Sequence, residues 1–117
     1  MANVALAQGV NVGASNTDIY QTNPNLVKTR IDSAYIVSND AGGPVSVDIW
    51  VTPDADTPVS NSLKIVDASD FQVGDGQTRP ITGLIGQIIN SGGRVIANAS
   101  ATGCSIWLNG RTFKTDI

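Results

Sequence analysis

The side chains that could carry out chemistry in this sequence are almost all aspartates. The chain has ten acidic residues and no histidine, and all ten acids are Asp, because the sequence contains no Glu. A serine or cysteine nucleophile normally needs a histidine base, and catalytic proton transfer needs a choice of titratable groups that this chain mostly lacks. We therefore predict that the protein is not an enzyme and has no catalytic residues.

The same aspartates could instead hold a hard cation, because calcium takes carboxylate oxygens as ligands. They fall in segments typical of loops, but these segments lack the spacing of a known calcium-binding loop. Asp is also favoured in turns, where its side chain bonds to the nearby backbone. We therefore expect neither a metal site nor any other cofactor. The residues that would form a calcium site in the alternative case are Asp54, Asp56, Asp67, Asp70 and Asp75.

Charge and hydropathy argue against two classes of partner. The net charge is −3, and the seven basic residues are scattered singly, whereas nucleic acid binding needs a basic patch that neutralises phosphates. No apolar run approaches the roughly 20 residues that cross a bilayer, and the N-terminus lacks the basic region of a signal peptide. We therefore expect no nucleic acid partner, no membrane partner, and synthesis in a cytoplasm.

The composition predicts a fold built from short strands. The 117 residues correspond to a single domain, and the absence of Glu together with twelve Gly is typical of strands joined by many turns. Charged residues make up only 15% of the chain, against about 25% in an average domain, which suggests that much of the surface faces protein. We predict an all-β domain, an antiparallel β-sandwich or jelly-roll-like barrel over residues 16–117.

Two pairs of alternating segments predict β-hairpins, the first from residues 30–38 and 45–52. The intervening residues 39–44 are rich in turn-forming Asn, Asp, Gly and Pro. Alternation of apolar and polar residues is the signature of a half-buried strand, and we pair Val37 with Val45. The inner face then holds Ile31, Tyr35, Val37, Val45, Val47, Ile49 and Val51. The outer face holds Ala34, Ile36 and Trp50 with Arg30, Asp32 and Asp48.

The second predicted hairpin joins residues 95–101 to residues 104–108 through a two-residue turn, Thr102-Gly103. Its inner face pairs small residues with larger ones, namely Ala101 with Cys104, Ala99 with Ile106 and Ala97 with Leu108. The single cysteine is thus expected to be a buried thiol that behaves as a small hydrophobic residue. The outer face holds Trp107 with Asn98.

Both tryptophans therefore fall on polar outer faces. An outward Trp is costly to leave in water and is enriched in binding hot spots, so Trp50 and Trp107 predict contact with another protein. The alternative is that a loop or an edge of the sandwich covers each ring.

Residues 1–15 are expected to form an N-terminal arm or an edge strand. Gly9 and Gly13 interrupt the apolar residues of this segment, which argues against a long strand of the main core. Such an arm can add backbone hydrogen bonds to the edge of a partner's sheet, with its side chains in alternate pockets. Its candidate contact residues are Val4, Leu6 and Val10.

The order of these segments resembles that of small structural proteins of tailed-bacteriophage virions, such as capsid cement or decoration proteins and small tail or fibre components. The segments that carry the resemblance are loose strand-and-turn patterns that cover most of the chain. They are ANVALAQGV (residues 2–10), IY (19–20), TRI (29–31), YIVSN (35–39), VDIWV (47–51), SGGRVIA (91–97) and WLNG (107–110). The resemblance implies a β-sandwich or jelly roll that assembles with other subunits, and it carries over no functional residues.

From these features we expect a capsid cement or decoration protein of the virion. It would bind and stabilise major capsid subunits, or other virion proteins, as a symmetric homo-oligomer. A tail, collar or fibre component is the first alternative. A carbohydrate-binding β-sandwich, in which Trp50 or Trp107 stacks on a sugar while Asp and Asn bind its hydroxyls, is the second.

Overall fold

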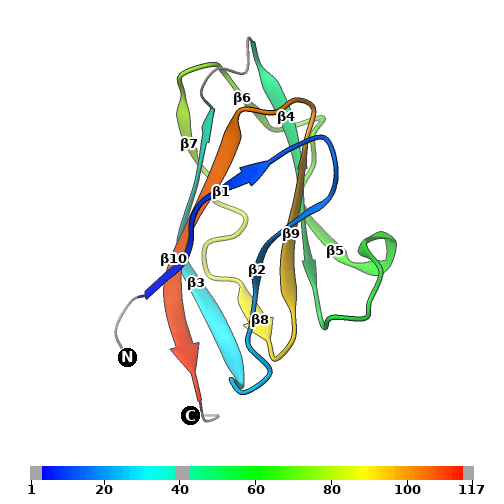
Figure 1. Ribbon diagram of the computed structural model, residues 1–117, viewed down its shortest axis with the longest axis vertical. Coiled ribbons are helices and arrows are strands. Elements are labelled where there is room, and N and C mark those ends of the chain that lie inside the picture. The colour runs from blue at the N-terminus through cyan, green and yellow to red at the C-terminus, as the bar shows by residue number, and fades with distance from the viewer. Residues whose placement is uncertain (1–3, 39–42, 115–117) are drawn as a thin grey trace.

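A computed structural model of the chain describes residues 4–38 and 43–114. Within these residues the only helical segment is the 3-10 turn η1 (Val59–Asn61), and all other regular structure is β-strand. No helix in these ranges is long and apolar enough to cross a membrane. The predicted all-β fold is therefore confirmed (Figure 1).

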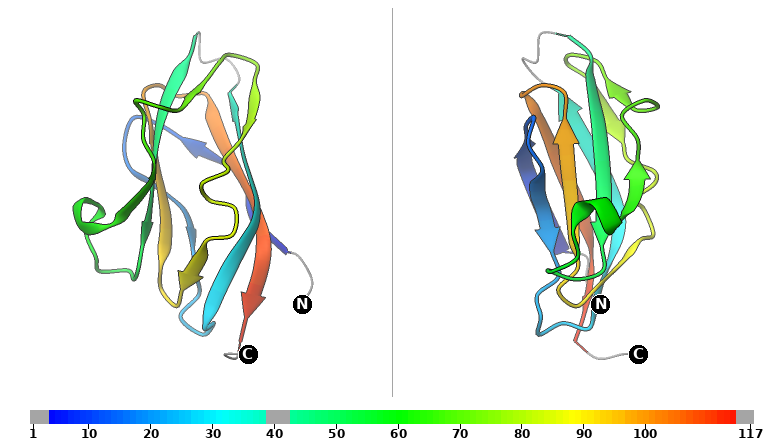
Figure 2. Two further views of the ribbon diagram at one scale, coloured as in Figure 1. Left: turned by 180° about the vertical axis from the view of Figure 1, so that it is seen from behind. Right: turned by 90° about the vertical axis from the view of Figure 1, so that its right-hand side faces the viewer.

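The strands form two five-stranded antiparallel sheets that face each other as a sandwich (Figures 1 and 2). Sheet A has the order β1-β10-β3-β7, and β8 also pairs with β3; sheet B has the order β2-β9-β4-β5, and β6 also pairs with β4. The strands of sheet A are β1 (Val4–Val12), β3 (Lys28–Ser38), β7 (Thr78–Pro80), β8 (Ile88–Asn90) and β10 (Cys104–Phe113). Those of sheet B are β2 (Thr17–Gln21), β4 (Val45–Thr52), β5 (Leu63–Val66), β6 (Gln72–Val73) and β9 (Arg94–Ala99).

Neither predicted hairpin forms. β3 pairs with β10, β7 and β8 in sheet A, whereas β4 pairs with β9, β5 and β6 in sheet B. β9 and β10 likewise lie in opposite sheets. Alternation specifies which side of a strand is buried, but two strands joined by a short turn can bury those sides equally well by facing each other across the core.

The inward faces of β4, β9 and β10 are those predicted from the alternation. Facing side chains of the two sheets interdigitate in one core, as expected for aligned sheet packing, and Cys104 is buried in it as predicted. The core residues of these three strands are Val45, Val47, Ile49, Val95, Ala97, Ala99, Cys104, Ile106 and Leu108, each at most 1% exposed.

The predicted face of β3 is wrong in its second half. Ile31 is buried, but the next inward residues are Ala34 and Ile36, and Tyr35 is 44% exposed. The pairing with β10 shifts register where Asn109 and Gly110 lie opposite Ser33 and Ile31. This β-bulge inserts one residue and moves every later side chain to the other face of the sheet.

The N-terminal segment is a nine-residue edge strand, β1, paired with β10 of the same chain. Ala7 and Val12 are in the core, so the expectation that glycine would prevent a long strand here is wrong. Register shifts on both sides of Ala7 let the strand continue, and Gly9 takes a positive φ of 67° within the second of them. Only glycine adopts such a φ without strain.

Candidate functional site

Two of the aspartates considered as calcium ligands, Asp54 and Asp67, accept hydrogen bonds within turns. Asp54 Oδ1 accepts hydrogen bonds from the backbone N–H of Asp56 and from both the N–H and the hydroxyl of Thr57. The hydroxyl bond of Thr57 is the main cause of a lowered pKa at Asp54. Within residues 4–38 and 43–114, no three His, Cys, Asp or Glu side chains come together as metal ligands would.

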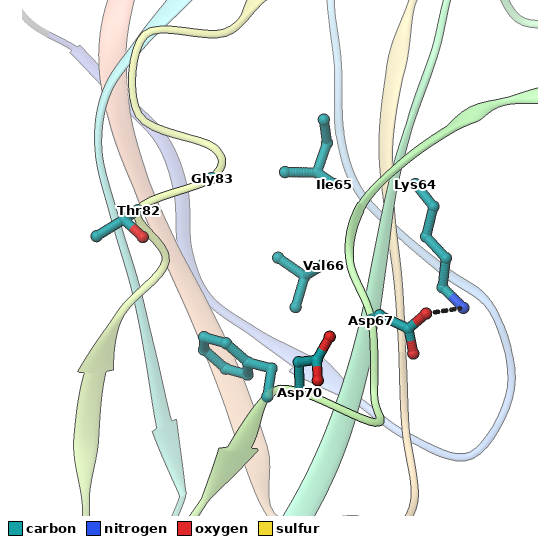
Figure 3. Close-up of a pocket in the computed structure, with 8 residues that line it drawn as sticks. Lys64, Ile65, Val66, Asp67, Asp70, Thr82 and Gly83 are labelled. Carbon is teal, nitrogen blue, oxygen red and sulfur yellow. Dashed lines mark ion pairs between the residues drawn. The ribbon is translucent and has the colours of Figure 1, made fainter.

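Two hollows lie along the edge where β5 faces the segment between β7 and β8. One has a volume of about 400 Å³ and the other about 330 Å³. In the larger one, Ile65 and Val66 point from β5 toward Thr82 and Gly83 (Figure 3). Gly83 permits a close approach, because a Cβ there would lie 2.8 Å from Ile65 Cγ2. These hollows are spaces left where β5 and the β7–β8 segment share no ladder of hydrogen bonds.

Lys64 and Asp67, two charged residues that line the larger hollow, are engaged with each other. Lys64 Nζ lies 2.9 Å from Asp48 Oδ1 and 3.7 Å from Asp67 Oδ2, and the hydrogen bond to Asp48 is the main cause of the raised pKa of Lys64. The backbone N–H of Ser69 bonds to Asp67 and lowers the pKa of its carboxyl. These contacts join β5 to β4 and to the turn that follows β5.

Trp50 lies on the outer face of sheet B and is half-buried. Its register neighbours are Ile96 of β9, only 2% exposed, and Lys64 of β5. Lys64 Nζ sits 5.4 Å from the centre of the Trp50 ring, a distance at which a cation is attracted to the ring. The outward orientation was predicted, and the ring is also partly covered by its own chain, as the alternative interpretation proposed.

The residues predicted to share an outer face with each tryptophan mostly lie in the opposite sheet. Arg30 and Asp32 lie on β3 in sheet A, away from Trp50, and Asn98 lies on β9 in sheet B, away from Trp107. Of the predicted group around Trp50, only Asp48 shares its strand, where it pairs with Asn98. This correction follows directly from the hairpins that do not form.

The outer face of sheet A carries two exposed aromatic side chains, Trp107 and Tyr35. Tyr35 was not among the predicted contact residues. Trp107 is 43% exposed and pairs in register with Tyr35, which is 44% exposed. A Cβ on Gly9 would lie 3.0, 3.3 and 3.5 Å from three consecutive atoms of the Trp107 ring. Such similar distances indicate that the ring packs over Gly9, while Trp107 as a whole keeps 43% of its surface exposed. We call Tyr35 and Trp107 the aromatic pair.

Polar side chains that lie beside the aromatic pair, toward the C-terminal end of β10, are bonded to one another. Asn109 Nδ2 donates to Ser33 Oγ over 3.3 Å. Arg111 Nε donates to Asp32 Oδ2 over 2.9 Å, and Arg30 Nε lies 3.5 Å from Asp32 Oδ1. The outer face of sheet A therefore combines an exposed aromatic surface with a rim whose hydrogen bonds are made internally.

The three arm residues proposed as contacts differ in their accessibility. Leu6 and Val10 are partly buried and pack against the protein's own core, whereas Val4 is 41% exposed. Val4 is thus the arm side chain best placed to reach a neighbouring molecule.

Comparison with known proteins relates the chain to others by its fold alone. No protein-family model and no curated protein sequence matches it. Among solved structures, the chain is similar to one in the T13 particle of infectious bursal disease virus, with a TM-score of 0.53 and 9% identity over 96% of this chain. A chain in the VP2 subviral particle of the same virus gives a TM-score of 0.45 and 11% identity over 95%. The protein spans only 30% and 31% of those chains.

Proposed function

We propose that the protein is a non-enzymatic structural component of a virus particle that acts by binding other virion proteins. The observation that carries the proposal is the similarity of nearly the whole chain to part of a viral particle protein, at a TM-score of 0.53. A shared fold does not by itself define a function, so the surface chemistry has to agree with the proposal. It does, because the chemical inventory is poor in catalytic groups and one sheet presents large aromatic side chains to the outside.

Within this role, we propose a capsid cement or decoration protein that binds major capsid subunits. The sequence resemblance to small proteins of tailed-bacteriophage virions supports this position, and the low fraction of charged residues suits a surface that is buried on assembly. Assembly onto the virion would then take place in the host cytoplasm. A tail, collar or fibre component would use the same surface chemistry at another position in the particle.

The outer face of sheet A is the binding surface that we propose. Its aromatic pair is exposed, while the Trp50 ring on sheet B is half-buried beneath Lys64. Exposed Trp and Tyr side chains dominate binding energy at the centres of protein interfaces. Val4, at the start of the edge strand β1, extends this apolar surface.

The same observations favour a protein partner over a sugar. A sugar needs free hydrogen-bonding groups beside the stacking ring for its hydroxyls. Asn109 and Ser33, two strand positions from Trp107 and Tyr35, are already bonded to each other. A protein surface needs only shape and apolar area from such a face, with a rim that keeps out water.

The test is the binding of purified protein to purified virus heads that lack it. Truncating a central Trp typically costs about 2 kcal/mol, which is roughly a 30-fold loss of affinity. We expect Trp107→Ala and Tyr35→Ala each to weaken attachment by about this factor. Leu63→Ala is the matched control, since Leu63 is 61% exposed but lies on β5 of sheet B; it should bind like the wild type.

Two results would contradict the proposal. One is unchanged attachment of both sheet A variants, measured at temperatures where circular dichroism shows that they are folded. The other is capture of the wild-type protein by immobilised glycans with no affinity for heads, which would support the carbohydrate-binding alternative.

A further inference from the structure

The two outer faces of the sandwich present charges of opposite sign. On sheet A, Arg30 and Arg111 have side chains 49% and 41% exposed, and both contact Asp32, whose side chain is only 19% exposed. The carboxylate is therefore the inner member of this cluster, and the two guanidinium groups are the outer members.

Sheet B has the reverse arrangement. Asp18 is 60% exposed, while its cationic neighbour Arg94 is 17% exposed, because Arg94 also donates hydrogen bonds to Thr52 Oγ1 and to the carbonyl of Thr57. Asp67 is 53% exposed beside Lys64, which lies over Trp50. The outermost charged groups on this side are carboxylates.

The loop after β4 adds to the negative side. It is held to the outer face of sheet B by Arg94 and Thr52, and it passes in front of the sheet in the right panel of Figure 2. Its Asp54 and Asp56 are exposed. Sheet B and this loop thus carry several carboxylates, against two cations that are both engaged internally. Of the chain's ten aspartates, β3 and β10 hold only Asp32.

We propose that the protein associates with further copies of itself face to back, the outer face of sheet A in one copy binding the outer face of sheet B in the next. Arg30 and Arg111 of one copy would meet exposed carboxylates such as Asp18 of the next. The aromatic pair would contribute the apolar part of the interface. This proposal rests on the proposed structural role. It names a second copy of the chain as one partner of the outer face of sheet A.

Charge favours this arrangement over a symmetric pairing of two sheet A faces. In the symmetric pairing the exposed guanidinium groups meet no unpaired carboxylate, since Asp32 is the acid of this face and is already held by both arginines. Complementary potentials orient association and suppress the wrong pairing. A face-to-back contact uses two different patches, so it can repeat around a ring or along a filament.

The first measurement is the self-association of the full chain by sedimentation velocity over a range of salt concentrations. Exposed charge pairs are screened when the Debye length falls from about 30 Å at 0.01 M to about 3 Å at 1 M salt. We expect oligomers larger than a dimer at low salt and a loss of affinity on the order of tenfold or more at high salt. A protein that stays monomeric at low salt and high concentration would overturn the inference.

The second measurement uses two shape-preserving variants, each altered on one face. The A variant combines Arg30→Gln, Asp32→Asn and Arg111→Gln, and the B variant combines Asp18→Asn and Asp67→Asn. Each variant alone should be monomeric, because every contact needs one intact face of each kind. Their mixture should form a 1:1 complex and nothing larger, since the B variant still offers sheet A and the A variant still offers sheet B.

Other outcomes of these experiments would overturn either the face-to-back association or the proposed function. Self-association of the B variant alone, or no complex in the mixture of two folded variants, would overturn face-to-back binding. Head binding by a protein that remains monomeric would overturn this inference and leave the proposed function intact. Salt-sensitive self-association without head binding would support this inference and contradict the proposed function.

Discussion

Replacing Gly110 with alanine should strongly destabilise the protein. Gly110 is buried in β10 at the bulge opposite β3. A Cβ added there would collide with the carbonyl oxygen of Arg30 and would lie 3.0 Å from its carbonyl carbon and 2.9 Å from Leu6 Cδ1. The side chain of Leu6 can rotate away, but the Arg30 carbonyl belongs to the backbone of β3, which is held between β10 and β8.

The size of the effect follows from what must move. Relief of the collision requires β10 to separate locally from β3, which weakens one or two ladder hydrogen bonds worth about 1 kcal/mol each. Overpacking strain in a close-packed interior adds about 1–3 kcal/mol. The free energy of unfolding should therefore fall by about 3 kcal/mol, and the melting temperature by on the order of 10–15 °C for a domain of this size.

Urea denaturation followed by tryptophan fluorescence measures this loss, because Trp107 lies on the affected strand. Gly43→Ala is the control, since a Cβ there would meet no atom within 4 Å; it should be neutral or slightly stabilising by reducing the entropy of the unfolded chain. If Gly110→Ala unfolds within about 0.5 kcal/mol of the wild type, the ordinary range of surface substitutions, the close approach of β10 to β3 is wrong.

Three further predictions test other parts of the fold. Gly9→Ala places a Cβ 3.0 Å from the Trp107 ring at a φ of 67°, so we expect a loss of about 1–3 kcal/mol and a shifted Trp emission; an unchanged spectrum would contradict the stacking. Cys104 is 1% exposed, so a thiol reagent should modify it only after unfolding, and rapid labelling of the native protein would show otherwise. The lowered pKa of Asp54 stabilises the fold above the ordinary carboxyl pKa, and this contribution is lost as the pH falls through the lower folded value. Asp54→Asn should remove that part of the acid dependence of the melting temperature, and an identical pH profile would exclude the role.

The sequence predicted which side of a strand is buried better than it predicted the neighbours of that strand. The alternation in residues 45–52 and 104–108 identified the core residues of β4 and β10. It could not identify their pairing partners, because an apolar face is satisfied equally by a hairpin within one sheet and by two strands in opposite sheets. The choice depends on how all the strands of residues 4–38 and 43–114 share one core, which no local pattern contains.

The aromatic pair shows a second limit of prediction from the sequence. Trp107 was expected on an outer face, and it is there. Tyr35 was assigned to the core, because the alternation of residues 30–38 was read as unbroken, and the bulge near Asp32 reverses it. A conflict is visible in the pattern, since that phase places both Ala34 and Ile36 outward, but no local pattern indicates where the extra residue lies. The role of Gly9 beneath Trp107 was equally hidden, because residues so far apart meet only through the β1–β10 pairing.

The failure of the hairpins has a consequence for assembly. In a hairpin, Trp50 would share its face with Arg30 and Asp32, and one mixed surface would carry both kinds of charge. Because the chain crosses between sheets after β3 and again after β9, the exposed arginines stay with Trp107 on sheet A, while Trp50 stays with the aspartates on sheet B. A surface with both signs of charge can satisfy itself across a two-fold axis. Two unlike faces on opposite sides of a thin sandwich find their complements only on neighbouring molecules, so in the proposed face-to-back association the topology of this chain, more than its composition, would give the assembly its direction.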